Sequence, residues 1–139
     1  MLIGEYEHSL DAKGRVIVPV KFREDLSDIF YITKGIDGCL FVFSKEEWKK
    51  LEQKIITMSI FKSRGIQRFF FSGAAQIVAD ANGRILIPQP LRNFASLKKD
   101  VIFLGTITRV EIWDKLRWKK ASDSLTDESI KQAMSLMDI

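Results

Sequence analysis

Short runs of apolar, β-branched residues, each ended by a turn or by a proline, predict a chain that is rich in short strands. Residues 15–18 and 84–87 are two such runs, and Pro19 and Pro88 stop them. Further strands are predicted at residues 29–34, 39–43, 101–104 and 110–113. Because proline suits the first position of a helix, short helices are predicted over residues 19–26 and 88–95.

Two longer helices have starts that can be recognised in the sequence. Ser44 and Asp114 are N-cap residues, and Glu47 stands three positions after Ser44, as in a capping box. An aromatic residue before each cap is spaced to pack on Trp48 or Trp118 as a hydrophobic staple. Both tryptophans are therefore predicted to be packing residues rather than platforms that stack on a ligand.

The segment between the two halves of the chain is predicted to be helical and basic. The helix that starts after Ser44 continues to about Ile56, and a second helix covers residues 61–71 with Gly73 as its C-terminal stop. From residue 45 to residue 73 there are seven Lys or Arg and three Glu, a local charge of +4. This charge is either a solvated helix face or part of a nucleic-acid surface.

A last helix is predicted over residues 126–138, with Thr126 as its cap. Its apolar residues follow helical spacing and suit docking on the body or on a neighbouring subunit: Ile130, Ala133, Met134 and Met137. Together with the aromatic run at residues 69–71, which is more aromatic surface than one small fold comfortably buries, this stripe predicts a homo-oligomer. The alternative for residues 69–71 is that they cover the ends of the fold.

The chain contains two copies of one unit. Residues 11–19 repeat as residues 80–88 at an offset of 69, and residues 42–50 repeat as residues 112–120 at an offset of 70. The sequence therefore predicts repeat 1 at residues 4–50, a helical linker at 51–72, repeat 2 at 73–120 and a C-terminal helical tail at 121–139. Units of about 45 residues are too small to close a core alone, so we expect the two to intertwine.

The amino-acid composition limits the functions that this chain can have. The 139 residues carry 22 Lys+Arg, 18 Asp+Glu and a net charge of +4, so a nucleic-acid surface would have to be a local concentration of basic residues. Cys39 is the only cysteine, which excludes an internal disulfide and a Cys-cluster zinc site, and the single His8 argues against a two-His metal site. There is no apolar run of membrane-spanning length and no signal-peptide pattern at the start, so we expect a soluble, cytoplasmic protein without a membrane partner.

The motifs of common enzymes are missing. The sequence has no phosphate-binding P-loop, no Gly-x-Ser-x-Gly elbow, no His-Glu-x-x-His pair and no evident acid/base couple. We therefore expect no enzymatic activity, no cofactor, no metal and no small-molecule substrate.

The repeated turns carry the most specific signal. Asp11 and Gly14, like Asp80 and Gly83, have the spacing of a type I turn followed by a left-handed glycine, which is a common hairpin connection. These four residues are predicted to structure the turns.

The turns also carry basic and polar residues that folding does not require. Arg15 and Arg84 stand at the first strand position after each turn, and Lys13 and Asn82 stand at the turn tips. These four residues are candidates for contacts with DNA. An Asp–Arg pair that only supports the turn is the alternative, and both roles can hold together because a carboxylate can orient a guanidinium that still points outward.

These residues resemble the MraZ family, within the broader AbrB-like group of swapped-hairpin DNA-binding proteins. The resemblance rests on Asp11-x-x-x-Arg15 and Asp80-x-x-x-Arg84, each followed by an apolar strand and a proline. Residues 4–6 (Gly-Glu-Tyr), residues 110–113 (Val-Glu-Ile-Trp) and the total length fit too. It covers about residues 1–120.

The resemblance implies an α+β, β-rich fold, a pseudo-symmetric double swapped-hairpin barrel flanked by helices. It implies a nucleoid-associated transcriptional regulator, a repressor of the bacterial cell-division and cell-wall gene cluster. Such a protein would bind promoter direct repeats in double-stranded DNA as a ring-shaped homo-oligomer, an octamer or a dodecamer. The alternative function is an antitoxin-like protein-interaction module without its own operator.

Overall fold

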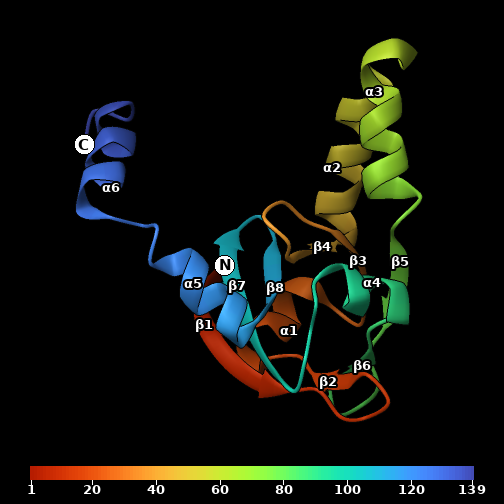
Figure 1. Cartoon of the computed structure of the whole chain (residues 1–139). Coiled ribbons are helices and arrows are strands. Elements are labelled where there is room, and N and C mark those ends of the chain that lie inside the picture. Colours follow the sequence, from red (N-terminus) through yellow and green to blue (C-terminus); the bar gives the residue numbers. More distant parts are fainter.

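A computed structural model describes all residues from 1 to 139. Its main element is a six-stranded antiparallel sheet with the order β1-β7-β8-β4-β3-β5 (Figure 1). The strands, in that order, are Leu2–Ser9, Asp100–Ile107, Val110–Asp114, Leu40–Ser44, Ile29–Lys34 and Ala75–Val78. A separate two-stranded ribbon pairs β2 (Arg15–Ile17) with β6 (Arg84–Leu86).

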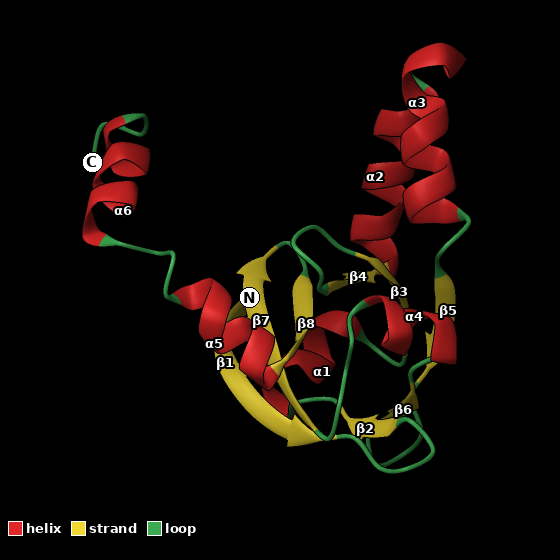
Figure 2. Cartoon of the chain, viewed as in Figure 1, coloured by secondary structure: helices red, strands yellow, loops and turns green.

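Helices surround the sheet and extend beyond it (Figure 2). They are α1 (Val20–Leu26), α2 (Lys45–Ile56), α3 (Ile60–Ile66), the π-helical turn η1 (Gln67–Phe71), α4 (Gln89–Phe94), α5 (Lys115–Ser122) and α6 (Asp127–Ser135). All predicted helices are present, but Pro19 and Pro88 are N-cap residues rather than first helical residues. None of these helices combines the length and the apolar character that crossing a membrane requires.

The two repeats exchange strands. β1 of the first half pairs with β7 of the second, whereas β5 of the second half pairs with β3 of the first. At the centre β4 pairs with β8, where Leu40 lies opposite Ile112 and Val42 opposite Val110. The predicted closed barrel is not confirmed, because the sheet is open with β1 and β5 as its edge strands and the ribbon is a second sheet.

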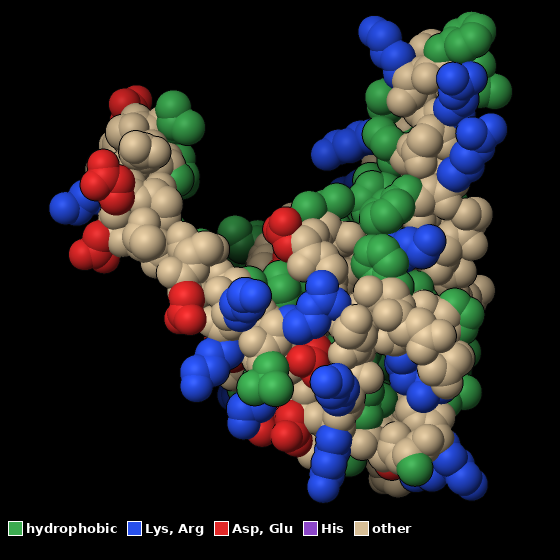
Figure 3. Space-filling model, viewed as in Figure 1, with side chains coloured by type: hydrophobic (Ala, Val, Ile, Leu, Met, Phe, Trp, Pro, Cys, Tyr) green, Lys and Arg blue, Asp and Glu red, His purple; other side chains and the backbone are tan.

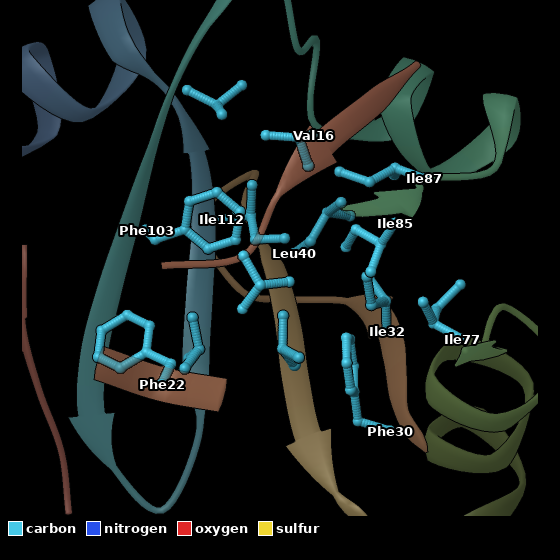
Figure 4. Close-up of a cluster of buried hydrophobic side chains, with 14 of the residues drawn as sticks. Val16, Phe22, Phe30, Ile32, Leu40, Ile77, Ile85, Ile87, Phe103 and Ile112 are labelled. Atoms are coloured by element: carbon cyan, nitrogen blue, oxygen red, sulfur yellow. The ribbon is translucent and has the colours of Figure 1, made fainter. Parts of the chain in front are cut away.

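One core serves both halves of the chain. A cluster of 19 buried residues draws on both repeats (Figure 4). The first four residues of β4 are all apolar because both faces of this strand are covered. Leu40 and Val42 enter this core, while Phe41 and Phe43 enter a second cluster of seven buried residues. Successive side chains of a strand point to opposite faces, so a strand covered on both faces has no polar positions.

The capping and staple predictions are confirmed in part. The side chain of Ser44 accepts the N–H of Glu47 at 3.2 Å, but the Glu47 carboxylate accepts from Lys50 at 3.0 Å instead of completing the capping box. The ring centroids of the two predicted staples lie 5.7 Å and 5.4 Å apart. Trp48 is buried in the second cluster and Trp118 packs against it, as predicted.

The aromatic run at residues 69–71 packs within the chain. Phe69 lies 5.9 Å from the Phe94 ring and Phe71 lies 4.5 Å from the Trp48 ring. The structure thus favours the alternative in which this run covers the fold, and the run does not argue for an oligomer. The second predicted helix ends just before Gly73, as predicted, with η1 ending at Phe71 and Ser72 as its C-cap. Gly73 is not left-handed, but a Cβ there would come within 2.9 Å of the Phe69 carbonyl oxygen, so close packing requires the glycine.

Candidate nucleic-acid interface

The first repeated turn is built around one carboxylate. Oδ1 of Asp11 accepts the backbone N–H groups of Lys13 and Arg15, each at 2.9 Å. Oδ2 of the same carboxylate accepts Nε–H of Arg15 at 2.8 Å. Asp11 therefore both shapes the turn and orients the guanidinium.

The second turn repeats this geometry. Oδ1 of Asp80 accepts the backbone N–H groups of Asn82 and Arg84 at 2.9 Å, and Oδ2 accepts Nε–H of Arg84 at 3.3 Å. Gly14 and Gly83 have φ values of +85° and +77°, the left-handed conformation that the spacing predicted. The turn-structuring assignment of Asp and Gly is thus consistent with the observed hydrogen bonds in both copies.

Hydrogen bonds shift the titration of both turn carboxyls. The backbone N–H of Arg15 is the main cause that lowers the pKa of Asp11 below its ordinary value of 3.8, and the backbone N–H of Arg84 does the same for the pKa of Asp80. A lowered folded-state pKa stabilises the turns fully above about pH 3.8, and this stabilisation is lost as the pH falls through the lowered pKa.

We expect carbon NMR titration to give both carboxyls a pKa below 3.8. The backbone amide signals of Arg15 and Arg84 should shift with the same midpoints, because these amides donate to the carboxylates. Asp11→Asn should remove the pH dependence at Arg15 and leave that at Arg84. Midpoints at or above 3.8 would contradict the hydrogen-bonded turn.

The outer face of the β2–β6 ribbon carries both basic and apolar side chains. Arg15 lies opposite Leu86 and Ile17 lies opposite Arg84, and the middle residue of each strand is buried in the core. Because alternate residues share a face, these four side chains lie together on the outer one. Ile17 and Leu86 are 44% and 53% exposed, and the two arginines stand diagonally, about 7 Å apart along the strand direction. Ile17 and Leu86 were not identified from the sequence, although the alternation within each strand was a usable signal.

Two further arginines lie beneath the turns, and each comes from the other repeat. Nε of Arg23 donates to the carbonyl of Val18 at 3.0 Å, and its guanidinium lies where a Cβ on Gly83 would come within 2.4 Å. Arg92 has the same relation to Gly14. Arg23 and Arg92 continue the offset of 69, and this repetition is the sequence signal that marks them as part of the repeated unit.

The predicted contact residues lie at the two ends of one ribbon. The turn tips carry Lys13 and Asn82, both exposed, and the strands carry Arg15 and Arg84. Figure 3 shows Lys and Arg side chains along the lower edge of the molecule, where the β2–β6 turns lie. One backbone bond extends the pairing at each end: Val18 N–H donates to the Gly83 carbonyl at 2.9 Å, and Ile87 N–H donates to the Gly14 carbonyl at 3.0 Å. Because strands of the two repeats pair with each other, the two turn motifs lie on one surface.

The fold and this ribbon define a pseudo-symmetric two-repeat protein that displays a basic β-ribbon at one edge. A family model described as "MraZ protein, putative antitoxin-like" matches residues 1–68 and again residues 70–138. The chain belongs to this MraZ family.

Named relatives span the whole chain. The chain is 50% identical to the transcriptional regulator MraZ of Acetivibrio thermocellus over 143 residues, which cover 100% of both chains. It is 51% identical to the transcriptional regulator MraZ of a Thermoanaerobacter species, over 99% of this chain and 97% of the relative. The protein of the same name from Heliobacterium modesticaldum is 46% identical, over 99% and 98% of the two chains.

Proposed function

We propose that the chain is a transcriptional regulator that binds double-stranded DNA through the outer face of the β2–β6 ribbon and its two turns. The observation that carries this proposal is the matched pair of arginines, each held by an aspartate and both on one exposed face. The names of the relatives support the class of function.

The geometry of the arginine supports a contact role. Each aspartate binds Nε, so the Nη donors remain free to bind an acceptor outside the protein. A guanidinium that is already oriented loses less freedom when it binds a phosphate or the O6/N7 edge of guanine. The exposed tips of the turns add the charge of Lys13 and the amide of Asn82 as further contacts.

The size of the ribbon also fits DNA, because a two-stranded β-ribbon can enter the major groove. Ile17 and Leu86 would then contact base edges beside the arginines, and the 5-methyl group of thymine is the apolar feature of that groove.

Substituting uracil for thymine in the bound sequence should weaken wild-type binding by about 0.8 kcal/mol for each methyl group that the ribbon buries. The double variant Ile17→Ser, Leu86→Ser should bind the thymine and uracil sequences equally, because both apolar contacts are gone. Val78→Ser, a control at another exposed strand position, should keep the preference for thymine. Equal wild-type binding to both DNAs would exclude the methyl contact.

Assembly and targets complete the proposal. The protein forms a ring of eight or twelve copies, and the ring binds direct repeats in promoter DNA because each copy presents the same ribbon. The targets are the promoters of the cell-division and cell-wall gene cluster, which it represses. In each copy, repeat 1 (residues 4–50) and repeat 2 (73–120) build the ribbon, while the linker (51–72) and the tail (121–139) serve assembly.

The experiment that tests this function is binding to the DNA upstream of the protein's own gene, measured by fluorescence anisotropy over a series of salt concentrations. We expect binding that exceeds binding to a scrambled sequence and that weakens with salt, since phosphate contacts release counterions. Failure to bind either DNA would instead favour the antitoxin-like protein-interaction module.

A further inference from the structure

The C-terminal helix α6 has no partner within the chain. Every residue from 123 to 139 is exposed, and the helix extends away from the body (Figures 1 and 2). Its apolar residues Ile130 and Met134 are 43% and 37% exposed, one turn apart on the same face. A helix of nine residues is too short to be stable in water without packing. The apolar face of α6 therefore needs a surface to cover it.

The α2–α3 hairpin presents a surface of the required kind. Four large apolar side chains at its tip are exposed, Ile56, Met58, Ile60 and Phe61. Below the tip, a groove of about 340 Å³ lies between α2 and the π-helical turn η1 that continues α3, lined by Glu52, Ile55, Ile56, Gln67 and Phe71. This hairpin and α6 are the two parts of the molecule that project from the body, and in Figure 3 both carry hydrophobic side chains at their surfaces.

The charges of the two projecting parts are opposite. Residues 45–73 carry seven Lys or Arg and three Glu, a net charge of +4. Residues 123–139 carry four acidic side chains and one lysine, a net charge of −3. Lys62 and Arg64 are exposed on α3, and Asp127 and Glu128 are exposed in the first turn of α6. Such complementarity favours pairing between the two and disfavours hairpin–hairpin or tail–tail contacts.

The two surfaces cannot meet within one molecule in this arrangement, because α6 and the hairpin stand on opposite sides of the body (Figure 1). We propose that α6 of one copy docks across the α2–α3 hairpin of a neighbouring copy. This contact joins two different surfaces, so each copy can bind the next one. The chain of copies closes into a ring when the rotation between neighbouring copies brings the last copy back to the first. The inference rests on the proposed homo-oligomer and names the contact that builds it.

A cysteine experiment separates contacts between copies from contacts within one copy. A chain that carries both Phe61→Cys and Met134→Cys is treated with a bismaleimide cross-linker. The native Cys39 does not interfere, because it is buried and burial raises the pKa of its thiol to about 12. We expect a ladder of covalent multimers from the double variant. An equimolar mixture of the two single variants should give covalent dimers and no larger species.

Three results would overturn the docking contact. The first is cross-linking of the double variant within single chains. The second is cross-linking of either single variant alone that is as efficient as that of the double variant. The third is no cross-linking in an oligomer whose mass is confirmed by light scattering. The second result would indicate a symmetric contact between two tails or two hairpins.

Charge reversal tests the same contact without a cross-linker. Asp127→Lys with Glu128→Lys, or Lys62→Glu with Arg64→Glu, should each weaken self-association about tenfold, because repulsion replaces attraction. All four substitutions in one chain should restore association, measured by analytical ultracentrifugation. Restored association would also show that the tail substitutions had not simply unfolded helix α6, because substitutions in the hairpin could not refold it. Absence of rescue would count against the pairing.

Failure of this inference is distinguishable from failure of the proposed function. The ribbon and the docking surfaces share no residue, so the charge-reversed chains should bind a DNA fragment with one target site as the wild type does. Loss of the α6 contact with retained DNA binding would overturn the docking proposal alone. Wild-type protein that assembles through this contact but binds no DNA would overturn the function alone.

Discussion

The double variant Arg15→Ala, Arg84→Ala is expected to fold and assemble normally and to lose most of its affinity for promoter DNA. The two side chains are 36% and 48% exposed, and substitutions at such positions change the free energy of unfolding by about 0.5 kcal/mol or less. Their ion pairs with Asp11 and Asp80 are exposed to solvent, which screens them, so losing these pairs should change stability little. Thermal unfolding should therefore change little.

The expected loss of binding is much larger. A bidentate contact between arginine and guanine contributes about 1–3 kcal/mol, so two such contacts correspond to roughly 2–6 kcal/mol. If an arginine binds phosphate instead, the slope of log K against log salt should fall by about one for each contact. Anisotropy titrations at several salt concentrations, on the target and on a scrambled sequence, measure both quantities.

A matched control separates position from charge. Lys119→Ala with Lys120→Ala removes two positive charges from α5, where both side chains are exposed and belong to neither the ribbon nor the docking surfaces, and should weaken DNA binding far less. Lys13→Ala should have a smaller effect than Arg15→Ala, because a lysine at a turn tip offers one point charge without the guanidinium fork. Normal binding by the folded double variant would assign both arginines to the turn alone.

The sequence predicted the features that depend on neighbours along the chain. Asp11 and Gly14 are three residues apart, and their roles in the turn follow from backbone preferences alone. The caps at Ser44 and Asp114 are local in the same way, and both accept the expected backbone N–H.

Features that depend on distant pairing were not predictable in this way. β1 and β7 are separated by about 90 residues, and no local preference specifies that β1 leaves its own repeat. The contact of Arg23 with Gly83 follows from the same exchange, so its place beside the second turn appeared only in the structure. The run at residues 69–71 was ambiguous because an aromatic side chain suits a core and an interface equally well.

The last prediction concerns the core that the two repeats share. Ile112 in β8 is completely buried and lies opposite Leu40 of the other repeat, so Ile112→Ala leaves a cavity at the seam between the halves. We expect a loss of about 2–5 kcal/mol in the free energy of unfolding, as for large-to-small substitutions in packed cores. Ile32→Ala, at a completely buried position in β3 of the first repeat, should cost a similar amount. Ile36→Ala makes the same chemical change at a 55% exposed position and should cost far less.

The shape of the unfolding curve tests the shared core more directly than the size of the decrease in the free energy of unfolding. Because both isoleucines belong to one cluster, each variant should lower the midpoint of the same single transition in urea, with far-ultraviolet circular dichroism and tryptophan fluorescence changing together. Protein concentration must be equal in all samples, since association also stabilises the folded chain. Two transitions, with Ile112→Ala lowering one and Ile32→Ala the other, would mean that the repeats are separate folding units. The exchange of β1 and β5 makes that outcome unexpected, because neither repeat can unfold without taking an edge strand from the sheet of the other.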